Sequence, residues 1–275
     1  MVSIEAVWDK TSEFIGDRTG DVLRIALPLG FVPMALLGIV MPLVGREPSL
    51  RNLVIGGATV VLSIVALWGN LALTALVLEP TGWRTAIRLG AGRLPAKVLT
   101  SLVELVVAGL LTVPIFVAFA ISGVVPGQMQ ATGTLPAMPL GPATFILIYT
   151  LALIVAVLVL LARLLLVDAA LVAERRGVSA LVRSLRLTRG LTLKLVGVLL
   201  LYVIVSQVAA LATRMVFGAI LGLFTLGDQT PNPATVITAI LVALVQTAFS
   251  VLAVVFAARV FVAVRDGRGT IVELA

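Results

Sequence analysis

Long apolar stretches separated by short polar connections run through the whole chain. A helix needs about 20 consecutive apolar residues to cross the hydrocarbon core of a bilayer, and helices are favoured there because their backbone groups pair within the segment. The pattern predicts an all-α polytopic membrane protein with six transmembrane helices, over residues 22–44, 53–78, 98–123, 143–167, 195–223 and 235–263. Arg214 interrupts the fifth stretch, so residues 214–224 either continue that span or form a separate interfacial helix.

Composition supports lipid as the solvent for much of the chain. Of the 275 residues, 60% are hydrophobic and 12% are charged, against roughly 25% charged residues in a soluble domain. So little polar surface cannot cover a globule in water. The net charge of +7 lies in short connections rather than on a folded basic surface, so nucleic acid is not an expected partner.

The Lys and Arg residues of the connections lie almost entirely on one side of the predicted membrane. Fourteen of them fall in segments 1–21, 79–97, 170–194 and 264–275. The opposite connections, 45–52, 124–142 and 224–234, hold only two, Arg46 and Arg51. Because cytoplasmic connections carry the excess of Lys and Arg, this bias predicts a multi-pass protein of the bacterial inner membrane with both termini in the cytoplasm.

This orientation divides the chain into three parts. They are an N-terminal amphipathic cytoplasmic segment (1–21), a single six-helix transmembrane domain (22–264) and a short cytoplasmic tail (265–275). We expect no cleavable signal peptide, because acids and apolar residues are mixed from the start. The apolar side of the first segment is formed by Ile4, Val7, Trp8, Phe14 and Ile15, and its acids are Glu5, Asp9, Glu13, Asp17 and Asp21. This segment either lies at the membrane interface or docks its acids on the basic connections.

The two long basic connections resemble each other at an offset of 95 residues. Residues 75–88 align with residues 170–183 without a gap. The matched polar positions and glycines are Glu79 with Glu174, Gly82 with Gly177, and Arg88 with Arg183. Both copies follow a predicted span on the same side, which is the arrangement of a parallel internal repeat.

Each copy predicts an amphipathic elbow after the second and fourth helices. The glycine permits a sharp turn, and apolar residues then recur at i, i+3, i+4 and i+7, on one helical face. These residues are Trp83, Ala86, Ile87 and Gly90 in the first copy and Val178, Leu181, Val182 and Leu185 in the second. We expect this face to lie on lipid, with the basic residues among anionic headgroups. The predicted lipid or partner surface is Arg84, Arg88, Arg93, Arg183, Arg186 and Arg189. Gly190 suits the C-cap of the second elbow.

Besides Arg214, charged residues inside the apolar spans or at their edges include Glu104, Arg163, Asp168 and Arg259. A charge at the membrane centre costs about 2.5–3.5 kcal/mol or more, so each needs a partner or a polar surrounding. Glu104 and Arg163 are at comparable depths, and we expect them to pair, either as a structural ion pair or as a site for a lipid headgroup or small anion. Arg259 is expected to snorkel or to meet Asp168. Glu79 and Glu174 are expected to pair with nearby arginines or with a helix N-terminus.

The chain contains no histidine and no cysteine. This removes thiolate nucleophiles, the usual zinc and haem ligands, and any histidine acid–base relay. An intramembrane enzyme would have to use Glu79, Glu104, Asp168 or Glu174, and these carboxylates form no catalytic motif. We therefore expect no catalytic residue, no metal and no cofactor.

The second basic connection also carries a family resemblance. The run Ala170-x-x-x-Glu174-x-x-Gly177-x-x-Ala180-Leu181-x-Arg183-Ser184-x-x-Leu187-Thr188-Arg189-Gly190 resembles the signature of a bacterial integral membrane family. That family includes the membrane domain attached to some glycerophosphodiester phosphodiesterases and related small inner-membrane proteins. The resemblance implies a six-helix membrane domain connected with lipid. It brings no catalysis, since the phosphodiesterase activity of those relatives belongs to a separate soluble barrel.

Two functional hypotheses follow. The first is a non-enzymatic inner-membrane protein that interacts with anionic lipid, or scaffolds a protein partner, through its basic interfacial helices. The alternative is a small transporter or channel, because Pro and Gly in the spans permit broken helices. Such a path would have to use the few polar span residues, Asn70, Ser206, Gln207, Gln246 and Thr247.

Overall fold

The computed structural model describes residues 4–41, 50–79, 82–123, 139–175, 177–222 and 233–272, with side chains described up to residue 266. All regular structure in these ranges is helical. The elements are α1 (Ile4–Asp17), α2 (Thr19–Ala26), the π-helical turn η1 (Leu27–Phe31), α3 (Val32–Val40), α4 (Leu50–Leu78), α5 (Trp83–Ile121), α7 (Leu140–Leu164), α8 (Val167–Ala173), α9 (Ser179–Leu187), α10 (Thr192–Gly222) and α11 (Pro233–Val272).

The six predicted spans are confirmed as helices. Six helical segments of the described chain are long and apolar enough to cross a membrane: Thr19–Val40, Leu50–Leu78, Trp83–Ile121, Leu140–Ala173, Thr192–Gly222 and Pro233–Asp266. The fifth runs without a break past Arg214 to Gly222. A separate interfacial helix beginning at Arg214 is therefore wrong; residues 223 and 224 lie outside the described residues.

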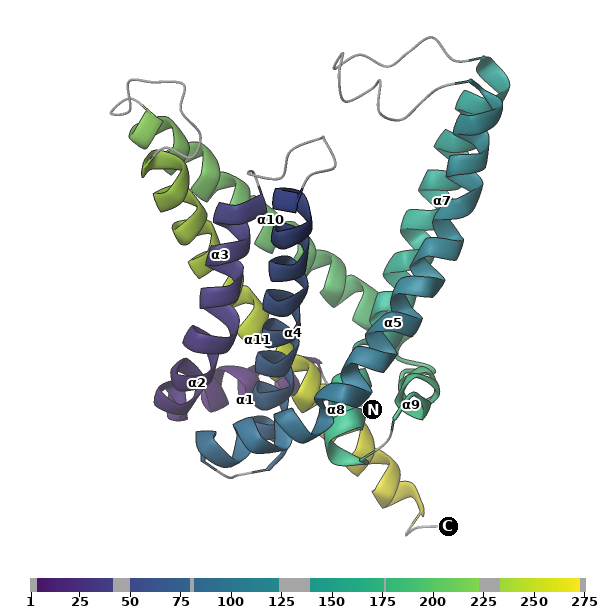
Figure 1. The fold of residues 1–275 in the computed structure, drawn as a ribbon. Helices are drawn as coiled ribbons and strands as arrows, with labels where there is room; N and C mark the ends of the chain where they lie inside the picture. Colours follow the sequence, from purple (N-terminus) through teal and green to yellow (C-terminus); the bar gives the residue numbers. More distant parts are fainter. Residues whose placement is uncertain are drawn as a thin grey trace.

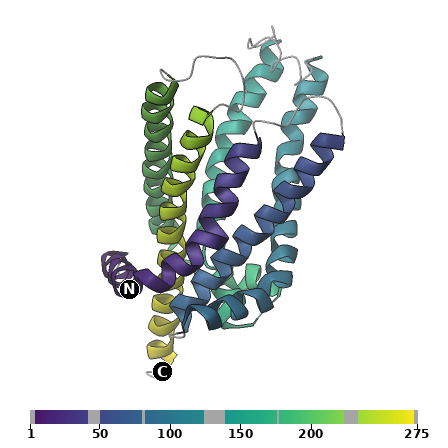
Figure 2. The same ribbon diagram turned by 60° about the vertical axis from the view of Figure 1, so that its left-hand side comes forward.

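The spanning helices run alongside one another, and α1 lies across their ends (Figures 1 and 2). Helix α9, the start of α5 and the last turns of α11 lie at this same end (Figure 1). We call it the basic end, because the Arg-rich segments 79–97 and 170–194 belong to it. The opposite end, where α3 and α7 meet the connections 42–49 and 124–138, is called the far end.

The buried core is concentrated toward the basic end and forms two clusters. One joins α2, α4 and the start of α5 around Ile25, Leu71 and Ala86. The other joins α8, α9 and α11 around Leu171 and Phe261. In the most apolar stretch of α4, 44% of residues are buried, against 6% in α5 and in α7. Most of the apolar surface of α5 and α7 is therefore left for lipid.

The first span is not a regular α-helix. It contains the π-helical turn η1, with Pro28 near its start. Proline removes one backbone donor and crowds the preceding turn, which favours such a local widening. A side chain on Gly69 of α4 would place its Cβ 2.9 Å from the carbonyl oxygen of Leu29. Glycine at this position thus allows α4 and η1 to approach at backbone distance.

The two basic connections follow different backbone paths. Helix α5 begins at Trp83 and continues to Ile121 with Pro95 inside it, and its first turns lie across the basic end before it turns along the bundle (Figure 1). Helix α9 is instead a separate element that ends at Leu187, before α10 begins at Thr192. A separate elbow helix thus follows only the fourth span, and the internal repeat stays a prediction from the sequence.

Candidate functional site

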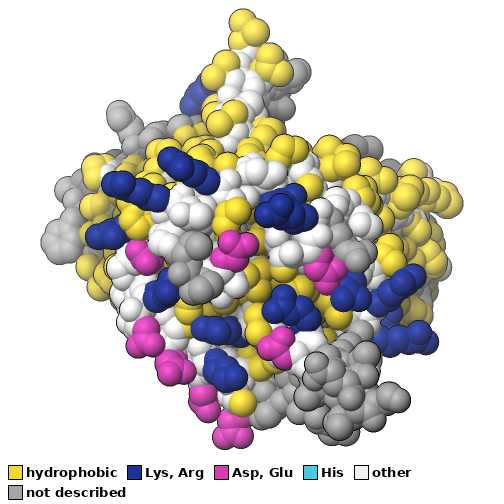
Figure 3. All heavy atoms as spheres, turned by 90° about the horizontal axis from the view of Figure 1, so that it is seen from below, with side chains coloured by type: hydrophobic (Ala, Val, Ile, Leu, Met, Phe, Trp, Pro, Cys, Tyr) yellow, Lys and Arg dark blue, Asp and Glu magenta, His cyan; other side chains and the backbone are white. Residues whose placement is uncertain are grey.

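The basic end carries most of the charge of the molecule. Viewed from below, Lys and Arg side chains are spread over this end among acids and apolar side chains (Figure 3). The predicted residues Arg84, Arg88, Arg186 and Arg189 are exposed there, whereas Arg93 is half-buried. The candidate site is therefore an open charged surface rather than a cleft.

One cluster on this surface combines cations with an aromatic ring. The guanidinium carbon of Arg84 lies 5.2 Å from the centre of the Trp83 ring, and that of Arg24 lies 6.0 Å from it. Arg24 also faces Asp21 at 3.7 Å, but it remains largely exposed. We call Arg24, Trp83 and Arg84 the tryptophan–arginine cluster. The sequence did not indicate Arg24 as a surface residue, because its position falls within the first predicted span.

The apolar face at the start of α5 packs on protein at Ala86 and Gly90. Both residues are buried, and the indole Nε1 of Trp68 in α4 donates to the carbonyl of Ile87 at 2.9 Å. A Cβ on Gly90 would lie 2.8 Å from the backbone nitrogen of Ala72. The predicted lipid contact is wrong for Ala86 and Gly90, because α4 covers them, whereas Trp83 is only half-buried.

In α9 the buried face differs from the predicted one. Its buried residues, Ala180, Ser184 and Leu187, form a face that the apolar pattern did not indicate. In the predicted face Val178 and Val182 are exposed, with Leu181 and Leu185 half-buried. Leu181 packs against the core cluster of α8, α9 and α11. Val178 and Val182 are left uncovered, so the predicted lipid contact stays a prediction for these two.

Polar side chains anchor the buried face of α9. Ser184 Oγ donates to the carbonyl of Arg163 at 2.6 Å, and Thr188 Oγ1 approaches the same oxygen at 3.5 Å. Helix α7 ends at Leu164, and the last carbonyls of a helix have no partner within it. Ser184 thus satisfies a carbonyl at the break between α7 and α8. This hydrogen bond gives a structural reason for the serine of the Arg183-Ser184 motif.

The turn between α8 and α9 contains the predicted acid–arginine pair. Arg183 Nε lies 2.9 Å from Glu174 Oε1, which confirms that Glu174 pairs with a nearby arginine. Glu79, its counterpart in the first copy, is exposed at the end of α4. In the second copy the left-handed position falls on Arg175, with φ 51°, and not on Gly177.

The glycines of the first copy and of the α9 C-terminus also differ from one another. Gly82 has φ −72°, which any residue can adopt, so the predicted role of a glycine-dependent turn is wrong there. Gly190 has φ +92°, in agreement with the predicted glycine stop after α9.

An ion pair missed by sequence analysis joins α5 to α8. Lys97 Nζ lies 2.6 Å from Asp168 Oδ1, and the two side chains are 10% and 27% exposed. The sequence assigned Lys97 to a connection, whereas the structure places it inside a continuous helix, next to Asp168. Glu104 lies one or two turns further along α5 and interacts electrostatically with both residues.

The predicted partners of the two intramembrane arginines are wrong. Within the described ranges no ion pair links Glu104 to Arg163, and Asp168 is held by Lys97 instead of Arg259. Arg163 Nε and Arg259 Nε are both buried, and neither makes a hydrogen bond to a described residue. The guanidinium of Arg259 lies over the Phe14 ring at 5.0 Å. A cation–π contact thus replaces the expected ion pair.

Helix α1 packs by its apolar side on the protein. Val7 and Phe14 are buried, and the Trp8 and Phe256 ring centres are 6.3 Å apart. The acids Glu5, Asp9, Glu13 and Asp17 are exposed. The amphipathic helix is confirmed, with α11 rather than lipid alone covering its apolar side.

The polar span residues proposed for a transport path are spread over separate places. Ser206 and Thr247 donate to carbonyls of their own helices. Asn70 and Thr247 line a cavity of about 30 Å³, which has room for one or two water molecules. Gln246 lines a different, larger cavity near the far end.

This fold defines a multi-pass helical membrane protein. Comparison with protein-family models, curated proteins and solved structures gives no match. The resemblance to the phosphodiesterase-associated membrane family therefore stays a prediction from residues 170–190. Among the described residues, no group of three or more acids could hold a metal ion.

Proposed function

We propose that this chain is a non-enzymatic protein of the bacterial inner membrane that binds anionic lipid headgroups through its basic end. In this proposal the basic end lies in the cytoplasm, as the distribution of Lys and Arg favours. The lipid connection of the resembling family supports the same function.

The tryptophan–arginine cluster carries the proposal. Indole rings prefer the headgroup region of a bilayer, and guanidinium groups bind phosphate through several hydrogen bonds at once. Arg24 and Arg84 flank Trp83, and the exposed Arg88 is one turn further along α5. Two cations beside one half-buried indole, with a third cation a turn away, fit the phosphates of a negatively charged leaflet better than they fit a zwitterionic one.

Lipid selectivity of the purified full chain tests the proposal. Native mass spectrometry in mixed phosphatidylglycerol and phosphatidylcholine gives the ratio of bound anionic to bound zwitterionic lipid. Each interfacial arginine contributes about 1 kcal/mol toward an anionic surface. The double variant R24Q/R84Q should therefore lower the ratio at the basic end by up to roughly 30-fold. Arg51, exposed at the far end, provides the matched control, and R51Q should keep the ratio.

An unchanged ratio in R24Q/R84Q would contradict the proposal. The same arginines would then fit a scaffold role better, in which they bind an acidic surface of a protein partner. A loss of the same size in R51Q would also count against it, because the effect would then come from total charge and not from the cluster.

A further inference from the structure

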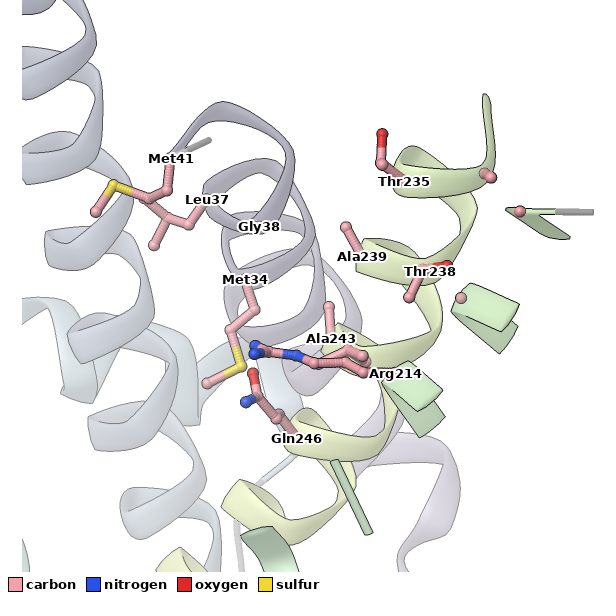
Figure 4. A pocket seen from close by; sticks show the side chains of 14 residues that line it. Met34, Leu37, Gly38, Met41, Arg214, Thr235, Thr238, Ala239, Ala243 and Gln246 are labelled. Atoms are coloured by element: carbon pink, nitrogen blue, oxygen red, sulfur yellow. The ribbon is translucent and has the colours of Figure 1, made fainter. Parts of the chain in front are cut away.

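A cavity of about 830 Å³ opens between α3, α10 and α11 near the far end. Its walls are mostly apolar, and its lining includes Met34, Leu37 and Met41 from α3 and its end, and Ala239 and Ala243 from α11 (Figure 4). Its polar lining is confined to Arg214, Thr235, Thr238 and Gln246. This is the size range of cavities that hold small ligands.

Arg214 is the one cation among the described residues of this lining, and its side chain crosses the cavity. It extends from α10 toward Met34 and Gln246 (Figure 4). It does not turn along the bundle toward Thr235, which would bring the charge closer to the far end. Gln246 is 13 residues after Pro233, the first residue of α11, or about 20 Å along the helix axis. The guanidinium thus points toward the middle of the span rather than toward the far end, and the residue is exposed rather than covered by the protein.

A guanidinium at this depth calls for an anion. A charge near the membrane centre is costly unless it is paired or solvated. Within the described residues, no acid pairs with Arg214. The hydroxyl of Thr238 is also buried, and it makes no hydrogen bond to a described residue. One cation and one unsatisfied hydroxyl therefore line a mostly apolar space, together with the polar side chains of Thr235 and Gln246.

We propose that this cavity binds an anionic amphiphile, with its phosphate or carboxylate on Arg214 and its acyl chain against the apolar walls. Guanidinium groups suit both acids because they donate two parallel hydrogen bonds. The methionines of α3 provide a flexible apolar wall for a chain. The site lies at the opposite end from the tryptophan–arginine cluster, so it goes beyond the proposed function and does not depend on it.

Photo-cross-linking of the full chain in nanodiscs tests this proposal. The probes are diazirine-labelled phosphatidylglycerol, a diazirine-labelled fatty acid and diazirine-labelled phosphatidylcholine, and peptide mapping locates the label. We expect saturable labelling of α3, α10 and α11 around the cavity by an anionic probe, about tenfold or more above the zwitterionic one. The stronger of the two anionic probes identifies the source of the acid. Equal labelling by phosphatidylcholine would overturn the proposal.

Two variants separate charge from space. R214Q should lose the anionic preference, whereas R214K should retain most of it. Gly218 also lines the cavity, and a Cβ there would meet no other atom within 4 Å. G218F should therefore place a phenyl ring inside the cavity and lower labelling by every probe. Gly109 of α5 is equally unobstructed but lies away from the cavity, so G109F is the matched control and should label normally.

A control at Asp228 keeps the result specific. Asp228 is the only acid in the connection 223–232, which lies outside the described residues. If D228N leaves anionic labelling unchanged, Arg214 is available to an external anion in the wild-type protein, as proposed. If the anionic preference appears only in D228N and not in the wild-type protein, Asp228 occupies Arg214 and the proposal fails. R24Q/R84Q should leave this labelling unchanged, which separates it from binding at the basic end.

Discussion

Lys97 Nζ lies 2.6 Å from Asp168 Oδ1, so an ion pair ties the lower part of α5 to the start of α8. Both side chains are largely removed from solvent. Few residues are buried in the most apolar stretches of the third and fourth spans, although the Tyr149 hydroxyl of α7 donates to the Leu111 carbonyl of α5 at 2.8 Å. At the basic end, the Lys97–Asp168 pair therefore contributes to how the third and fourth spans approach each other.

Removing one partner of this pair should destabilise the protein strongly. K97M or D168N leaves an uncompensated buried charge, which costs about 3–5 kcal/mol. The double variant K97M/D168L removes both charges and should recover much of that loss. Reversible unfolding in detergent–lipid micelles measures all three. The exposed pair Arg265–Asp266, at 3.6 Å, provides the control, and R265Q should change stability by less than about 1 kcal/mol. A double variant as unstable as the sum of the two single variants would contradict this account.

Replacing the hydroxyl of Ser184 should loosen α9 from the end of α7. S184A leaves the Arg163 carbonyl with only the 3.5 Å approach of Thr188, and a buried unsatisfied acceptor costs about 1–3 kcal/mol. Ser179 lies on the same helix but is exposed, so S179A is the matched control. Hydrogen exchange of α9 should accelerate in S184A and not in S179A; equal rates would show that this bond does not hold the helix.

A methyl group at Gly90 should be costly. Its Cβ would meet the backbone nitrogen of Ala72 at 2.8 Å, and backbone cannot move aside cheaply, so G90A should lose about 1–3 kcal/mol. Gly92 lies in the same helix with nothing within 4 Å. G92A should instead gain up to about 1 kcal/mol from helix propensity. Thermal unfolding of both variants checks the difference, and stabilisation by G90A would disprove the close contact of α5 with α4.

Arg175 carries backbone strain at the end of α8. Its φ of 51° lies in the left-handed region, which costs a residue with a Cβ roughly 1–2 kcal/mol. R175G should therefore stabilise the protein by about 1 kcal/mol, although glycine adds some entropy to the unfolded chain. Gly177 has no close neighbours and no left-handed φ, so G177A should be neutral or slightly stabilising. Thermal unfolding that showed R175G to be destabilising would contradict the turn geometry.

The sequence allowed the spans to be predicted, because bilayer thickness fixes the length of an apolar helix. It also indicated the pairing of Glu174 with a nearby arginine, since Arg183 lies within reach along the chain. The partners of Lys97 and Arg259 could not be predicted in this way. They depend on how helices distant in sequence are rotated against one another. Because every face of a spanning helix carries apolar residues, hydrophobic periodicity does not show which face packs on the protein.

The tryptophan–arginine cluster shows a similar limit. Arg84 and Trp83 are neighbours in the sequence, and their interfacial position follows from the end of the second span. Arg24 joins them only because α2 packs beside α5, near the core cluster around Ile25. Arg214 was visible as an interruption of an apolar span, but the cavity around it requires the arrangement of α3, α10 and α11.

Quenching of Trp83 fluorescence by brominated lipids tests the central claim most directly. The contribution of Trp83 is the difference between the wild-type protein and W83F, which leaves Trp8 and Trp68 in place. If the basic end binds anionic headgroups, brominated phosphatidylglycerol should quench this contribution more than brominated phosphatidylcholine at equal mole fraction, and R24Q/R84Q should remove the difference. Equal quenching by the two lipids in the wild-type protein would contradict the account.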